Sequence, residues 1–212
     1  MCIKRFLLSL LAVIMIAGCY PGGVKEYSET DIVLTTHKAD YAFSAAKTYV
    51  MSDKIPKVTT VPTEGQLPEY VDAATTSLIL NQIKANMTSR GYTQVTGTTK
   101  GDIVIMPAVV SVTTLVYYCN DWWYYWGWWG YYPGYPGYGG CYYPSGYTYT
   151  TGSLLITMVD DKNEDDKPET PIVGVWASAI NGMLSGTTST DNARITSSID
   201  QAFAQSPYIS AN

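Results

Sequence analysis

The stretch "GDIVIMPAVVSVTTLVYY" (residues 101–118) is the longest run of β-forming residues in the chain, and it largely decides the fold. Two later stretches have the same character: "GYTYTTGSLLITMVD" (146–160) and "TPIVGVWASAINGMLSG" (170–186). Three long strands in succession predict a meander of antiparallel neighbours. Pro107 cannot donate a backbone hydrogen bond, so it indicates an edge position or a bulge in the first of them.

Helical patterns lie on both sides of this meander. Residues 69–92 carry apolar side chains at helical spacing, and Gly91 stands where a left-handed residue would end the helix. Residues 191–207 predict a second helix with Asp191 as N-cap and Pro207 as its stop. The predicted buried positions are Val71, Ala74, Leu78, Ile79, Ile83 and Met87 in the first helix, and Ile195, Ile199 and Phe203 in the second.

Strands are also expected at about 46–51 and at 31–36, separated from the first helix by a proline-containing loop. The order of elements predicts an α+β domain. We expect a mostly antiparallel sheet with two helices packed on one face, and a long Tyr/Trp/Gly-rich hairpin insertion.

The insertion is "YYCNDWWYYWGWWGYYPGYPGYGGCYYPSGYTY" (117–149), with seventeen aromatic residues and one charge, Asp121. It keeps neither the period of a strand nor that of a helix, and a connection this long is usually functional or disordered. One interpretation is an aromatic flap that collapses onto the protein's own sheet. The other is an exposed contact surface, because Tyr and Trp combine large rigid area with a polar tip. Its central residues would be Trp122, Trp123, Tyr124, Tyr125, Trp126, Trp128, Trp129, Tyr131 and Tyr132.

The N-terminus has the features of a bacterial lipoprotein precursor. Lys4 and Arg5 precede an apolar run that is too short to span a bilayer but fits a secretory signal, and "IAGC" then matches a lipobox ending at Cys19. The alternative is a signal peptide with a cysteine near its cleavage site by coincidence. We expect a signal peptide at 1–18, a lipidated tether at 19–30 and a single domain at 31–212.

Charge and cysteine content exclude several classes of function. Loss of Lys4 and Arg5 would change the formal net charge from −5 to −7, so nucleic acid is not an expected partner. In an oxidising envelope, Cys119 and Cys141 would form a disulfide at the base of the insertion. The only histidine, His37, is far from both cysteines in the sequence, so we expect no metal site there.

Catalytic signatures are absent from the sequence, which contains no G-x-S-x-G, H-E-x-x-H or P-loop pattern. We therefore expect no enzymatic activity and no cofactor. The acidic turn imitates a calcium loop at Asp161, Asn163 and Asp165, but Asp166 replaces the required glycine and Ile172 the required glutamate. A plain charged turn is the favoured interpretation, and weak calcium binding is the alternative.

Five segments are informative as a set and in this order: "DYAFSAAKTYV" (40–50), "GDIVI" (101–105), "GSLLITMVDDKN" (152–163), "PIVGVWASAINGMLSG" (171–186) and "RITSSIDQAFAQSP" (194–207). Together they resemble the DUF4136 family of bacterial envelope lipoproteins. Val50-Met51 departs from the tryptophan usual at the end of the first strand, and the turn after Val159 is long and acidic. The resemblance implies the fold and an envelope location, and it implies no established activity.

The expected function is that of a non-enzymatic, lipid-anchored envelope protein whose aromatic loop contacts another component. A protein partner or self-association ranks first, the membrane interface second, and a glycan such as peptidoglycan third. A carbohydrate-binding module with stacked Tyr and Trp side chains is the contrasting hypothesis. The diacylglyceryl anchor would hold the protein to a bilayer. The residues after Cys19 favour the outer membrane, with the domain facing the periplasm.

Overall fold

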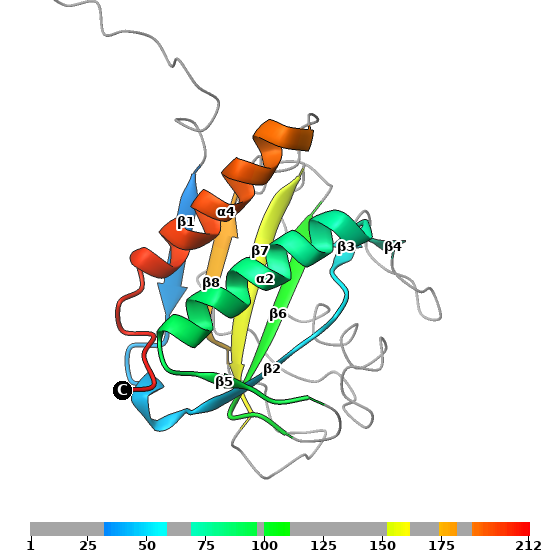
Figure 1. Cartoon of the computed structure of the whole chain (residues 1–212). Helices are drawn as coiled ribbons and strands as arrows, with labels where there is room; N and C mark the ends of the chain where they lie inside the picture. Colours follow the sequence, from blue (N-terminus) through cyan, green and yellow to red (C-terminus); the bar gives the residue numbers. More distant parts are fainter. Residues whose placement is uncertain (1–31, 59–68, 97–99, 111–151, 162–173, 182–187) are drawn as a thin grey trace, which may run out of the picture. The chain divides into compact units, whose positions relative to one another are not determined.

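In the computed structural model of the chain, the described part of Asp31–Asn212 forms a mixed eight-stranded sheet, and both described α-helices lie on one face of that sheet (Figure 1). The described residues are 32–58, 69–96, 100–110, 152–161, 174–181 and 188–212. The predicted α+β class, with helices on one face, is confirmed.

The strands of the sheet are β1 (Val33–His37), β2 (Thr48–Met51), β3 (Pro56–Val58), β4 (Glu69–Tyr70), β5 (Thr93–Gln94), β6 (Ile103–Val110), β7 (Ser153–Asp160) and β8 (Gly174–Ile180). Their order is β1-β8-β7-β6-β2-β5, with β3 beside β6 and β4 beside β3. The predicted meander is present, because β6, β7 and β8 pair in antiparallel fashion and β1 follows β8 in the same way. Strands β2 and β3 run parallel to β6, which the sequence did not indicate.

The expectation that Pro107 marks an edge or a bulge is wrong. Pro107 lies in the central strand β6, in regular register with Ile156 of β7. On the other side of β6, β2 pairs with residues 103–105 and β3 with residues 109–110. Pro107 therefore faces the break between two short strands, where no ladder bond requires its missing N–H.

The first helix, α2 (Ala73–Ser89), is shorter than expected because β4 occupies the predicted first turn. Asp72 caps it by accepting a hydrogen bond from the Thr75 backbone N–H at 3.0 Å, and this bond lowers the pKa of Asp72. Gly91 has a φ of +87°, which confirms the predicted left-handed residue after the helix. The predicted burial is right for Ile79, Ile83 and Met87, and wrong for Ala74, which is exposed.

The second helix, α4 (Thr188–Ala204), begins before Asp191, so the prediction of Asp191 as N-cap is wrong. It ends three residues before Pro207. Its predicted apolar face is confirmed, because Ile195, Ile199 and Phe203 are buried. A short 3-10 helix, η2 (Phe43–Ala45), connects β1 to β2 and buries Phe43.

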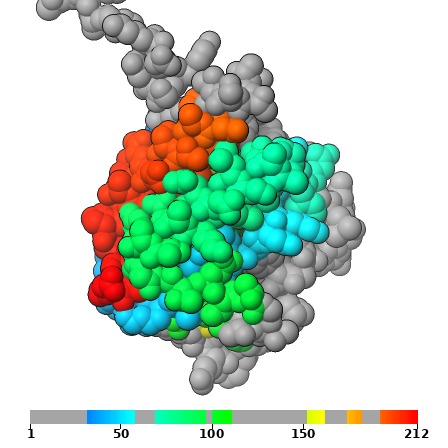
Figure 2. Space-filling view, viewed as in Figure 1, coloured from blue at the N-terminus to red at the C-terminus, as the bar shows by residue number. Residues whose placement is uncertain are grey.

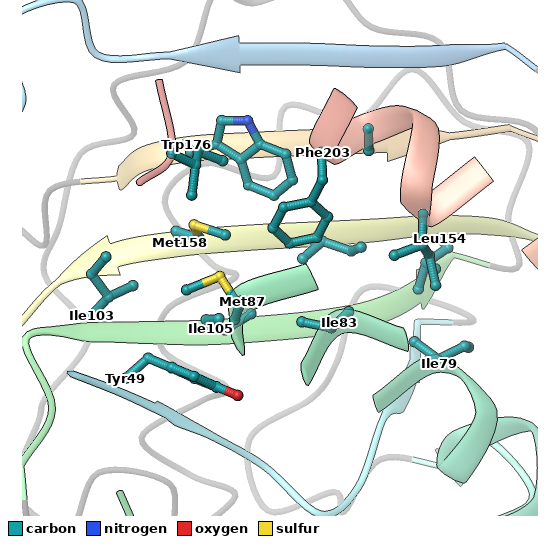
Figure 3. Close-up of a cluster of buried hydrophobic side chains, with 14 of the residues drawn as sticks. Tyr49, Ile79, Ile83, Met87, Ile103, Ile105, Leu154, Met158, Trp176 and Phe203 are labelled. Carbon is teal, nitrogen blue, oxygen red and sulfur yellow. The ribbon is translucent and has the colours of Figure 1, made fainter. Parts of the chain in front are cut away.

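The hydrophobic core lies between the two helices and the sheet (Figure 3). Trp176 of β8 and Phe203 of α4 lie with ring centroids 5.5 Å apart, and both are fully buried. The indole Nε1 of Trp176 donates a hydrogen bond of 2.8 Å to Ser206 Oγ. The buried indole N–H of Trp176 is thus hydrogen-bonded by the segment that follows α4.

Figure 2 shows the surfaces of α2 and α4 side by side, and Figure 1 shows that both helices lie over the sheet. Asp200 of α4 accepts hydrogen bonds from the side-chain amides of Gln82 and Asn86 on α2. Arg90 follows α2, and its guanidinium lies 5.0 Å from the centroid of the Phe203 ring. These contacts fix how the two helices lie against each other.

The "GD" that precedes β6 joins β6 to β2. Asp102 Oδ2 accepts hydrogen bonds from the backbone N–H groups of Lys47 (2.7 Å) and Thr48 (2.9 Å) and from Thr48 Oγ1 (3.1 Å). A Cβ on Gly101 would lie 2.9 Å from the backbone of Tyr49 and Val50, so a side chain there would force the two strands apart. Gly101 and Asp102 therefore have a structural role, which is to hold the start of β6 against β2.

We predict that Ile83→Ala and Phe203→Ala each lower the free energy of unfolding by about 2–5 kcal/mol, because each leaves a cavity in a fully buried site. Urea unfolding followed by circular dichroism measures this loss. Lys84→Ala is the matched control, since Lys84 is the exposed neighbour of Ile83 on α2. Unchanged midpoints for both core variants would contradict the assigned helix faces.

Candidate functional site

The residues that the sequence singles out for function all lie outside the described ranges. They are Cys19, the cysteines Cys119 and Cys141, and the aromatic residues of the insertion between 122 and 132. Their predicted roles therefore stay predictions. The structure describes the platform to which the aromatic insertion is attached.

That platform is the end of the β6–β7 pair. Val110, the last residue of β6, is paired with Ser153, the first residue of β7. The Gly152 N–H donates a hydrogen bond of 2.8 Å to the Val110 carbonyl, and Gly152 has a φ of +83°. Ser153 Oγ donates to Asn181 Oδ1 at 3.0 Å and so joins the end of β8 to the same place. Residues 111–151 thus leave and re-enter the sheet at adjacent positions of two central strands.

A second group of polar side chains lies near the other end of β6 and β7. Tyr41 Oη donates to Asp160 Oδ1 at 3.4 Å, and burial, followed by the nearby Asp160 carboxylate, raises the pKa of Tyr41 above its usual value. Tyr92 Oη donates to the Phe43 carbonyl at 3.0 Å, and burial raises the pKa of Tyr92 to about 12. Both phenols stay neutral near pH 7 and act as hydrogen-bond donors. Tyr41 joins the segment after β1 to the end of β7, and Tyr92 joins the residue before β5 to η2.

His37 is exposed at the end of β1. Its ring stacks on that of Tyr208, with centroids 3.9 Å apart. Phe43 is the third ring of this cluster, and the centroid of its ring lies 5.4 Å from that of Tyr208. No sequence spacing could reveal this contact, because 171 positions separate His37 from Tyr208. The cluster attaches the C-terminal segment to the edge of the sheet.

Two further classes of site were searched for. Within the described ranges, no three His, Cys, Asp or Glu side chains come together as a group that could hold a metal ion. The alternative of a calcium loop depends on Asn163 and Asp165, which lie outside those ranges. In the part of the chain that the structure describes, neither helix is long and apolar enough to cross a membrane.

Comparisons with known proteins agree with the fold. The sequence matches the family described as "Domain of unknown function (DUF4136)" over residues 33–208. The crystal structure of a DUF4136 family protein from Bacteroides thetaiotaomicron is similar, with 25% identity and a TM-score of 0.67, over 86% of this chain and 98% of that one. None of the curated proteins matches the sequence.

Two more distant structures are similar only in part. A PelC dodecamer from Paraburkholderia phytofirmans has 15% identity and a TM-score of 0.35, over 86% of this chain and 99% of that one. A PDZ domain protein from Parabacteroides distasonis has 16% identity and a TM-score of 0.43, over 84% of this chain and 36% of that one. At these TM-scores the two folds differ too much from this one to inform its function. The match over residues 33–208 is what assigns the chain, which belongs to the DUF4136 family.

Proposed function

We propose that this chain is a non-enzymatic, lipid-anchored protein of the bacterial cell envelope whose aromatic insertion binds another envelope component. Cys19 would carry the lipid, and the domain would face the periplasm from the outer membrane. Residues 19–30 would form the tether, which could reach about 40 Å when fully extended. A partner within that distance of the bilayer is therefore accessible to the domain.

The observation that carries the proposal is the way in which the insertion is attached. Seventeen aromatic residues and a single charge are placed in one connection between two central, fully paired strands. The Val110–Gly152 hydrogen bond and the Ser153–Asn181 hydrogen bond hold the base of that connection. A rigid base supports binding by a long connection, because it lowers the conformational entropy that must be lost when a partner is bound.

Three kinds of partner fit an aromatic surface, and we rank them as protein, membrane interface and glycan. A protein partner or a second copy comes first, because large patches of Tyr and Trp are typical of protein interfaces. The membrane interface comes second, since a lipid-anchored domain meets headgroups constantly. A carbohydrate-binding module is the alternative of a different class, in which the rings would stack on sugar faces.

The anchor is tested by metabolic labelling with an alkyne-bearing fatty acid. The wild-type chain should incorporate the label and sediment with membranes, and Cys19→Ala should lose both properties, because the thiol is the acceptor of the diacylglyceryl group. Cys2→Ala is the matched control, since Cys2 would leave with the signal peptide. Labelling that persists in Cys19→Ala would place the anchor elsewhere.

Cys119 and Cys141 should form a disulfide at the base of the insertion. Closing a loop of this length contributes about 3 kcal/mol through the entropy of the unfolded chain in the simple model. Proteolysis of envelope protein under non-reducing conditions, followed by mass spectrometry, should recover the two peptides linked. The domain should fold without the bond, because the described core contains neither cysteine. Free thiols at both positions in native protein would exclude this disulfide.

The partner class is tested by replacing residues 120–140 with a short Gly/Ser linker. In cells, chemical crosslinking of the wild type should give a discrete adduct that the deletion loses. Pull-down with purified peptidoglycan and binding to oligosaccharide arrays test the alternative with the same pair of proteins. Glycan binding that the deletion abolishes, without any protein adduct, would replace the leading proposal by the carbohydrate-binding one.

A further inference from the structure

The sheet has a second face, opposite the helices, that is apolar and buried. In β6 the odd-numbered residues Ile103, Ile105 and Val109 belong to the core beneath the helices. The alternate residues point the other way. They are buried as well, with exposed fractions of 4% for Val104, 4% for Met106, 0% for Ala108 and 2% for Val110. All eight residues of β6 are thus removed from water, on both sides of the strand.

Neighbouring strands extend this second face without adding a charge. Val104 is paired with Val159, Met106 with Thr157 and Ala108 with Leu155 of β7. On β8 the second face continues at Ala177, which is paired with Thr157, and at Ala179, which is paired with Leu155. On β2 it continues at Val50, which is paired with Val104. An antiparallel sheet that leaves one face to water alternates apolar with polar residues. The residues of β6 do not alternate in this way, because they are apolar on both faces. This second face is therefore expected to be covered.

The cover does not come from the described helices, because α2 and α4 both lie on the opposite face (Figure 1). Among the connections outside the described ranges, residues 162–173 carry four acidic side chains and two lysines, and residues 182–187 are only six long. Residues 59–68 include Glu64 and two prolines. Residues 111–151 are forty-one long and carry one charge, and they begin and end beside Val110 and Gly152.

We propose that residues 111–151 of the same chain pack on this second face and form a third layer, on the side of the sheet opposite the helices. The occupant matches the face in chemistry, since both are almost uncharged. It also matches in position, since both ends of the segment leave from the two strands at the centre of the face. A second copy of the chain and a separate partner protein are the competing occupants.

An estimate of area shows that part of the segment is sufficient. Four strands of up to eight residues present a surface on the order of 400–500 Å², from a rise of about 3.3 Å per residue and a strand spacing of about 4.8 Å. Tyr and Trp each bury about 150–250 Å² over all their sides, so roughly six rings lying on the sheet would cover it. The other rings would remain on the outer side of the layer. The proposed interaction surface would then lie on the sheet side of the domain.

Site-specific photocrosslinking tests the arrangement in the full-length, membrane-anchored chain. A benzoylphenylalanine residue would replace Ala177 on β8 or Val50 on β2, both half-buried on the second face and on strands that flank the β6–β7 pair. Lys84, exposed on α2, is the matched control position. After illumination, mass spectrometry should find peptides of residues 111–151 linked within one chain to positions 177 and 50, and none linked to position 84.

Links from positions 177 and 50 only to a second copy, to another protein or to other parts of the chain would overturn the proposal, and so would the absence of any link to 111–151. A second measurement uses Trp176→Phe, in which the five remaining tryptophans all belong to the segment. Their emission should be blue-shifted and resistant to acrylamide, and Met106→Ala should make them more accessible. The proposal stands apart from the proposed function, since these outcomes do not depend on whether a partner exists.

Discussion

The pairing of β6 with β7 is the constraint on which the rest of the structure depends. Eight consecutive residue pairs join Ile103–Val110 to Ser153–Asp160, across a connection of more than forty residues whose closure costs entropy. Everything else is added to this pair: β8 and β1 on one side, β2 and β3 on the other, and α2 and α4 over one face. A strand buried on both faces, as β6 is, supplies hydrophobic stabilisation from two layers at once.

Elements with a strong local pattern could be predicted from the sequence. The long strands, the two helices and the left-handed Gly91 were all evident from periodicity and turn chemistry. The short strands β3, β4 and β5 were not, because two or three residues carry no period and are extended only because a partner strand lies beside them. The same reason explains Pro107, whose place depends on the break between β2 and β3.

The polar contacts that hold the domain together were beyond prediction for a related reason. Asp102 bonds to Lys47 and Thr48, and Asp200 bonds to Asn86, across more than fifty and more than one hundred positions of sequence. Neither aspartate belongs to a known catalytic or binding motif, so only the folded chain shows that they join distant segments by hydrogen bonds. For the candidate site the situation is reversed: the sequence names the residues, and the structure supplies the platform beneath them.

The composition of the insertion suits a layer that is apolar on the side of the sheet and able to form hydrogen bonds on the side of a partner. A segment rich in Leu and Ile could cover Val104, Met106 and Val110, but its outer side would be insoluble. Tyrosine and tryptophan combine an apolar ring with a hydroxyl or an N–H, so a layer made of them can be dry toward the sheet and hydrogen-bonding toward the outside. The glycines and prolines between the rings allow the backbone to turn repeatedly over a limited area. In such a layer, the aromatic flap and the contact surface would be two sides of one structure.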